Sequence, residues 1–187
     1  MQILLSIFAA FFMFNGIIQN GFGIMYAEDP KKALAPLISL FLSGVMGWLI
    51  YTYVFNPIGF GEYGIFFLFP VTVLCCVVVD RLSAVIQHTK DNVLDKSVFS
   101  GYEGIAFYGA FQTLMFAQSL SQAFLFALGG ALGFMFVLMI LNGIQKRSEI
   151  EGVPMFFKGQ PLLLISTGLL SMLFSALVPL VIHLFSR

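Results

Sequence analysis

Long, uniformly apolar stretches dominate the hydrophobic pattern of this chain, and short polar or glycine-rich segments separate them. Most have roughly the 17–25 residues that a helix needs to cross a bilayer. Strands of a membrane barrel would instead alternate apolar and polar residues over about ten positions. The pattern therefore predicts an all-α, polytopic membrane bundle of six transmembrane helices. The six spans cover residues 3–25, 33–55, 65–79, 104–120, 122–144 and 162–185.

The composition favours lipid, not water, as the solvent around these stretches. Of 187 residues, 59% are hydrophobic and 10% are charged, whereas soluble domains carry about 25% charged residues. The length suits one integral membrane domain over residues 1–187, without a separate catalytic domain. The sequence has no catalytic triad, phosphate-binding loop or metal-ligand spacing, so we predict no catalytic and no metal-binding residue. A net charge of zero without a basic block argues against nucleic acid as a partner.

The basic residues predict the orientation of the bundle in the membrane. The segments between spans one and two, three and four, and five and six carry two, three and three of the nine Lys and Arg residues. Only Arg187 lies on the opposite side. Since basic residues concentrate in cytoplasmic loops, we expect a multi-pass protein of the prokaryotic cytoplasmic (inner) membrane with both termini outside. The expected cytoplasmic loops are 27–32, 88–103 and 145–161.

The six spans divide into two sets of three, which suggests an internal repeat with halves at about 1–87 and 104–187. With three spans in each half, the second half must insert in the inverted orientation. Spans one and four occupy corresponding positions and both carry amides and glycines, so they are candidates for broken half-helices. Paired, glycine-interrupted segments in inverted halves are typical of the functional midplane of transporters.

Four amide side chains in these two spans are the candidate midplane residues. Asn15, Gln19 and Asn20 lie in span one, with Asn15 and Gln19 on one helical face, and Gln112 lies in span four. They can line an ion or cofactor path. Alternatively, and in our view more often, such amides hydrogen-bond between helices at about 0.6–2 kcal/mol per contact. We interpret the glycines of span five, including Gly133, as sites of close helix packing.

The two cysteines, Cys75 and Cys76, are adjacent in span three. Neighbouring helical positions point about 100° apart, so a disulfide between them is not expected. As metal or cluster ligands they would need further thiolates from a partner subunit, which makes them weak cofactor-binding candidates. Buried free cysteines are also common apolar packing residues. We interpret the neighbouring Asp80-Arg81 pair as marking the end of this helix at the interface.

The last third of the chain resembles the membrane subunits of the Rnf/Nqr family. The segment Ile144–Gly159 contains, in order, an Arg/Lys-Glu pair, a Val-Pro and a Phe-basic-Gly, as the family loop does. Leu162–Phe174 is similar to the family's last helix. The Lys31-Lys32 turn and Gly47–Ile50 also resemble family features. The outward termini favour the RnfA/NqrE branch.

The resemblance implies a small six-helix subunit of an ion-translocating electron transport complex, paired with a sister subunit of opposite topology. In that family, spans one and four each supply a cysteine to an intramembrane iron–sulfur cluster. The matching positions here fall near Ile24 and near Gly109-Ala110-Phe111, where no cysteine stands, and such clusters need thiolate ligands.

This departure leads us to expect a family member that binds no cofactor by itself, with iron–sulfur and flavin groups in partner subunits. We expect it to be at most a non-catalytic subunit of an oxidoreductase. Two alternatives remain: a small-solute or ion transporter that uses the inverted-repeat bundle, and a scaffold or assembly subunit without redox activity.

Overall fold

The computed structural model describes residues 11, 17, 21, 23–27, 30–59, 63–86, 102–150 and 154–185. Throughout these residues the regular elements are helices, and none of them lies in a strand. The predicted all-α class is therefore confirmed for the part of the chain that is described. Asn15, Gln19, Asn20 and the greater part of the predicted loop 88–103 lie outside the described residues.

Span two is one long helix with an irregular final third. Helix α3 (Leu34–Ile50) continues through a π-helical turn, η4 (Tyr51–Phe55), into α4 (Asn56–Ile58), where Gly59 ends it with a φ of 83°. Glycine adopts this left-handed conformation without steric cost. A side chain on Gly64, which starts the next helix, would overlap the Tyr51 ring, with a Cβ only 2.2 Å from Cε2. The turn thus brings the end of span two against the start of span three.

Helix α5 (Gly64–Ile86) is longer than span three was predicted to be. It continues through Asp80 and Arg81 for more than one further turn, so the interpretation of this pair as the helix end is wrong. Arg81 is exposed, but Asp80 is only partly exposed and accepts a hydrogen bond from Tyr102. A buried partner compensates the carboxylate for lost water, which lets the helix carry it past the predicted boundary.

The second half begins with a short helix and continues with a very long one. Helix α6 (Glu103–Phe116) has 14 residues, about 21 Å at 1.5 Å per residue, and ends at the extended residue Ala117. Helix α7 (Leu120–Ile150) has 31 residues. Its last six residues were predicted as loop, and that prediction is wrong: Gln145–Ile150 are helical. The turn η6 (Met155–Phe157) leads to α8 (Gln160–Phe185).

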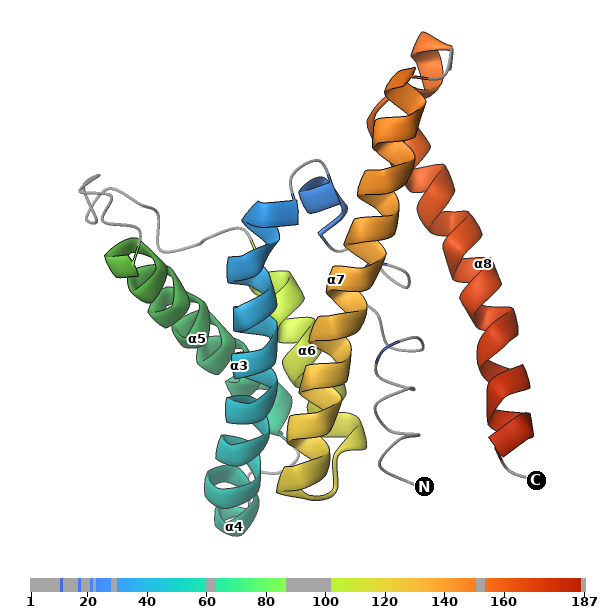
Figure 1. The fold of residues 1–187 in the computed structure, drawn as a ribbon. Coiled ribbons are helices and arrows are strands. Elements are labelled where there is room, and N and C mark those ends of the chain that lie inside the picture. Colours follow the sequence, from blue (N-terminus) through green and yellow to red (C-terminus); the bar gives the residue numbers. More distant parts are fainter. Residues whose placement is uncertain are drawn as a thin grey trace.

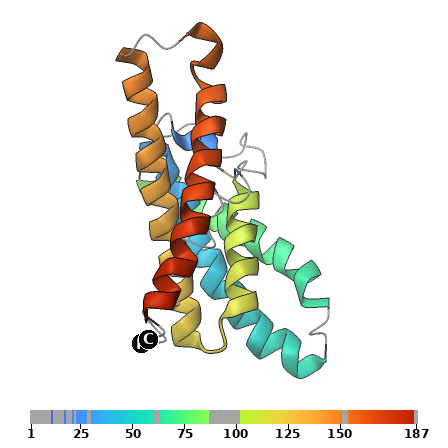
Figure 2. The same ribbon diagram turned by 90° about the vertical axis from the view of Figure 1, so that its right-hand side faces the viewer.

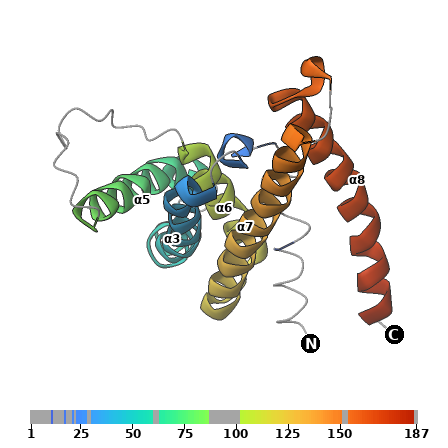
Figure 3. The same cartoon turned by 45° about the horizontal axis from the view of Figure 1, so that its top comes forward.

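Helix α3 is the centre of the bundle and packs against α6, α7 and α5, whereas α8 packs mainly on α7 (Figure 1). The view from the side shows α7 and α8 as a hairpin that rises beyond the other helices (Figure 2). From above, α8 stands at one side of the bundle and α5 at the other (Figure 3). The core is apolar, and its largest fully buried side chains include Phe134, Leu138, Leu141 and Leu163.

The helices alternate in direction and so define two ends of the bundle (Figure 1). The basic end holds the starts of α3, α6 and α8 and the ends of α5 and α7. Exposed basic side chains belong to it: Lys32, Arg81, Lys146, Arg147 and Lys158. The aromatic end holds α4, the start of α5 and the turn between α6 and α7, together with Trp48, Tyr53 and Tyr63.

Three helices are long and apolar enough to cross a membrane: Leu34–Ile58, Gly64–Leu82 and Leu120–Ser148. Gln160–Ala176 is a shorter apolar helix within α8. Many large apolar side chains on these helices are exposed, among them Phe66, Leu74 and Leu169. Lipid-facing helices require such an exposed apolar surface. The chain is therefore an integral membrane protein.

The end of span one is broken. Gly21 and Gly23 have φ values of 69° and 80°, and a short 3₁₀ turn, η2 (Ile24–Ala27), follows them. A second 3₁₀ turn, η3 (Pro30–Ala33), leads into α3. A Cβ on Gly23 would lie 2.9 Å from the ring of Phe134 and 3.1 Å from Ile105. Only glycine lets the broken segment pack this closely against α6 and α7.

Candidate functional site

The polar site that stands out at the basic end is a carboxylate–phenol cluster, formed by Tyr26, Asp80, Tyr102 and Glu103. Tyr102 and Glu103 at the start of α6 are 5% and 8% exposed. The Tyr102 hydroxyl donates to the Asp80 carboxylate of α5 at 2.5 Å. Glu103 occupies the first turn of α6, where the helix dipole favours a negative charge. Two helices and the chain after span one thus meet at a nearly buried pair of acids.

Tyr26 joins the cluster from the turn η2. Burial raises the pKa of its hydroxyl, and the nearby charges of Glu103 and then Asp80 raise it further. The phenol consequently stays protonated at neutral pH and available as a hydrogen-bond donor. Phenols beside carboxylates can hold and exchange protons. In the described part of the chain, however, no three His, Cys, Asp or Glu side chains are grouped so that they could hold a metal ion.

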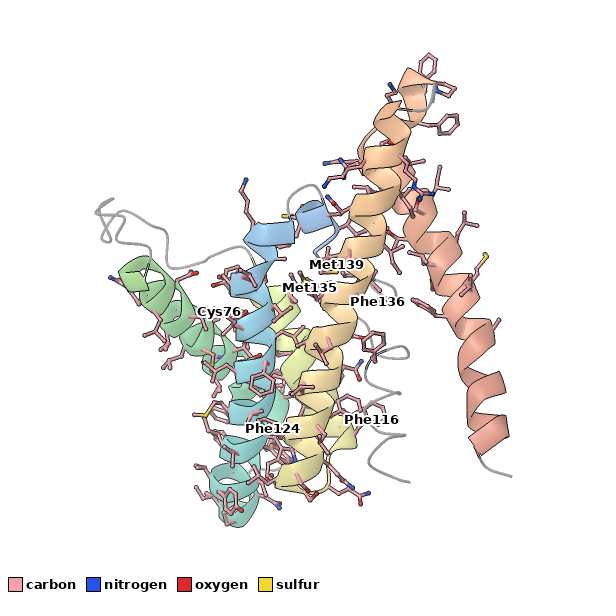
Figure 4. The ribbon with its side chains drawn as sticks, in the orientation of Figure 1. Cys76, Phe116, Phe124, Met135, Phe136 and Met139 are labelled. Carbon is pink, nitrogen blue, oxygen red and sulfur yellow. The ribbon has the colours of Figure 1, made fainter. Side chains whose placement is uncertain are left out.

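Both cysteines are free and buried on α5, at 5% exposure for Cys75 and 0% for Cys76. Cys76 lies between α5 and α3 (Figure 4), within hydrogen-bonding reach of Ser39. The Ser39 hydroxyl also donates to the carbonyl of Pro36 at 2.9 Å. This environment is a packed helix interface, which matches the interpretation of these residues as packing cysteines.

The middle of the bundle is a tightly packed seam between α3 and α6. The Ser43 hydroxyl donates to the carbonyl of Ala106 at 2.8 Å, which ties the two helices together. A Cβ on Gly44 would lie 3.0 Å from Thr113 Oγ1, and one on Gly109 would lie 2.7 Å from Leu40 Cγ. Small residues of this kind let membrane helices approach closely. Gln112 lies partly buried on α6 next to this seam.

The positions where the family resemblance places cluster cysteines are apolar. Ile24 packs against the hydrophobic core, Gly109 lies against Leu40, and Ala110 is completely buried. None of these side chains can ligate iron, because an iron–sulfur cluster needs thiolates. Cys75 and Cys76 belong to a different helix. The residues present therefore do not fit such a cluster.

Sequence reasoning did not find the carboxylate–phenol cluster. Tyr102 and Asp80 are 22 residues apart and come from the two sides of a predicted loop. The one available signal was Asp80, a charge at the end of an otherwise apolar span. Sequence reasoning did identify Gly133 as a packing glycine: a Cβ there would lie 2.3 Å from the backbone oxygen of Phe11. This prediction is confirmed.

Comparison with known proteins adds relatives of a single kind, the A-type subunit of the ion-translocating oxidoreductase complex. The chain is 31% identical over 155 residues to this protein from Alkalilimnicola ehrlichii, covering 80% of this chain and 78% of the relative. The protein of the same name from Thioalkalivibrio sulfidiphilus is 31% identical over 152 residues, with 79% and 78% covered. That of Vibrio atlanticus is 29% identical over 157 residues, with 79% and 78% covered. No protein-family model matches the chain.

Proposed function

Because this chain belongs to the family of A-type subunits of ion-translocating oxidoreductase complexes, we propose that it works as one membrane-spanning subunit of such a complex. The observation that carries the proposal is the 31% identity over 80% of the chain, which extends far beyond the loop motif that first suggested the family. The apolar helices agree with a membrane subunit. The other subunits of that complex are its partners.

We further propose six spans in a 3+3 inverted repeat, with halves at about 1–87 and 104–187. The alternating directions of α3, α5, α6, α7 and α8 support it (Figure 1). The break at Gly21–Gly23 and the 14-residue α6 support broken half-helices in spans one and four. The exposed lysines at the basic end support placing that end in the cytoplasm of an inner membrane, with both termini outside.

Within the complex, we propose that this chain binds no iron–sulfur cluster of its own. The apolar residues at the expected ligand positions support this, as does the distance along the chain of Cys75 and Cys76 from those positions. Iron–sulfur and flavin groups would then belong to other subunits, including a sister subunit of opposite topology. The contribution of this chain is then to pack and orient its neighbours and to line their path through the membrane.

Ion uptake by membrane vesicles tests the proposal. Inverted vesicles from cells that lack this chain should lose Na⁺ or H⁺ uptake driven by the complex's oxidoreductase reaction, and the wild-type chain should restore it. Uptake driven by ATP hydrolysis in the same vesicles is the control and should not change. Full oxidoreductase-driven uptake without the chain would contradict a role in the complex.

The transporter alternative makes a different prediction, because it needs no partner. Purified chain in liposomes would then carry ions or solutes by itself, and replacement of Asn15, Gln19, Asn20 and Gln112 by leucine would abolish that flux. If the chain is instead one part of a complex, it should give no flux alone, and the four substitutions should alter only the assembly or the coupled activity of the complex.

A further inference from the structure

Two polar landmarks fix the depth of α7 in a bilayer. At the aromatic end, the backbone N–H of Gln118 donates to Gln122 Oε1, and Trp48 Nε1 donates to the carbonyl of Ala117; tryptophan concentrates at membrane interfaces. At the basic end, Asn142 Nδ2 donates to the carbonyl of Ala27, directly before the charged segment 28–32. Gln122 and Asn142 are about 20 residue steps apart, or about 30 Å, which equals the thickness of the hydrocarbon core.

Helix α7 does not end at the second landmark. It continues from Asn142 to Ile150, about 12 Å further at 1.5 Å per residue. The headgroup layer on each side of a bilayer is only about 5–8 Å thick. A tilt of about 20°, the average for membrane helices, shortens this extension by less than 1 Å. The α7–α8 hairpin therefore passes through the headgroups into water, as its rise above the other helices suggests (Figure 2).

The end of this hairpin exposes large apolar side chains. We define the hairpin tip as Pro154, Phe156, Phe157, Lys158, Leu164 and Ile165. Phe156 is 89% exposed and Phe157 49%, and on the first turns of α8 Leu164 and Ile165 are 61% and 48% exposed. Between the latter two and the turn, Leu163 is buried against the core, so α8 already packs on α7 here. The exposed side chains are thus held on an ordered hairpin.

The charged side chains described around the hairpin tip are cationic. Lys146 and Arg147 on the last turns of α7, and Lys158 in the turn itself, are all exposed. Over residues 145–161 the sequence has three basic and two acidic residues. Lipid headgroups could satisfy these cations, but the depth of the hairpin places Phe156 beyond the headgroup layer. A protein surface suits both features, because aromatic anchors with a charged rim are typical of protein interfaces.

We propose that the hairpin tip is the docking surface for a peripheral, water-soluble protein on the cytoplasmic side, with an apolar recess for Phe156 and Phe157 and acidic side chains around it. This inference rests on the proposed function, which supplies both the cytoplasmic orientation and the multi-subunit setting. The turn that presents Phe156 is well formed: the backbone N–H of Phe157 donates to the carbonyl of Pro154 at 2.9 Å, and Gly159 has a φ of 82°. Its shape is therefore set before binding.

Accessibility of a single cysteine in native membranes tests the inference. In inverted vesicles with the whole complex, a bulky maleimide should label Phe156→Cys about tenfold more slowly than after an alkaline carbonate wash, which removes peripheral proteins; a tenfold change corresponds to about 1.4 kcal/mol of protection. Returning the wash fraction should restore the protection. It should fail to do so when Lys146, Arg147 and Lys158 are changed to glutamate. Phe157→Cys repeats the test, and the parent chain with buried Cys75 and Cys76 is the blank.

Lys32→Cys is the matched control, because Lys32 is exposed at the same end but lies outside the hairpin tip; its labelling should not change with the wash. Equally fast labelling of Phe156→Cys before and after the wash would overturn the inference, since the tip would be free. Slow labelling that persists after the wash and becomes fast only in detergent would overturn it in favour of lipid. Copurification of the membrane subunits from the same vesicles separates the two failures: if they copurify while the tip is free, only this inference fails.

Discussion

Replacement of Gly133 by alanine is expected to destabilise the protein by about 3 kcal/mol, at the upper end of the usual cost of overpacking. A Cβ at this position would lie 2.3 Å from the oxygen, 3.0 Å from the carbon and 3.0 Å from the Cα of Phe11. All three are backbone atoms, so no side chain can rotate away and either α7 or the segment around Phe11 must move. The free energy of unfolding in detergent, titrated with dodecyl sulfate, measures the loss.

Gly143→Ala is the matched control, since it changes the same helix and no atom lies within 4 Å of the added Cβ. Alanine favours a helix over glycine by up to about 1 kcal/mol, so this variant should be as stable as the wild type or slightly more so. A Gly133→Ala variant with wild-type stability would mean that the segment around Phe11 does not pack against α7.

Replacement of Tyr102 by phenylalanine is expected to lower the free energy of unfolding by about 1.5–3 kcal/mol, the usual contribution of a hydrogen bond to a charged group. The lost hydroxyl donates to Asp80 inside the carboxylate–phenol cluster, and Tyr102 is 5% exposed. Water cannot easily replace it there. Tyr53→Phe is the control, because Tyr53 is 67% exposed and its hydroxyl can bind water.

A double-mutant cycle assigns the loss to the contact itself. In an Asp80→Leu background the Tyr102 hydroxyl has lost its acceptor, so the further change Tyr102→Phe should cost little, and the two effects should not add. Full additivity of the two substitutions would show that Tyr102 and Asp80 stabilise the protein independently, and the hydrogen bond between them would carry no weight.

The membrane character and helical class were readable from the sequence, because lipid imposes a simple pattern of uniform apolar runs on the chain. The boundaries were less predictable where polar residues continue a helix. Asp80 did not end α5, because Tyr102 satisfies it, and α7 continued to Ile150 through a stretch of charged residues. Exposed charges in water do not stop a helix, so the loss of hydrophobicity after Ile144 marked the membrane boundary and not the helix end.

The sites were harder to predict than the spans, since they depend on contacts between distant segments. Neither Tyr102 nor Glu103 differs in sequence from an ordinary loop residue, and only the packing of α6 beside α5 makes them a cluster with Asp80. The packing role of Gly133 was predictable, because small residues in membrane helices usually mark close approach. The midplane role of Asn15, Gln19, Asn20 and Gln112 stays a prediction.

Purification of this chain from native membranes in a mild detergent tests the central claim most directly. We expect it to bring down further membrane subunits with the absorption of flavin and iron–sulfur groups. After dissociation of those subunits, the chain itself should be colourless and free of iron. Isolation of the chain alone from intact membranes, with no flavin or iron–sulfur partner at any stage, would contradict its assignment as a subunit of an ion-translocating oxidoreductase.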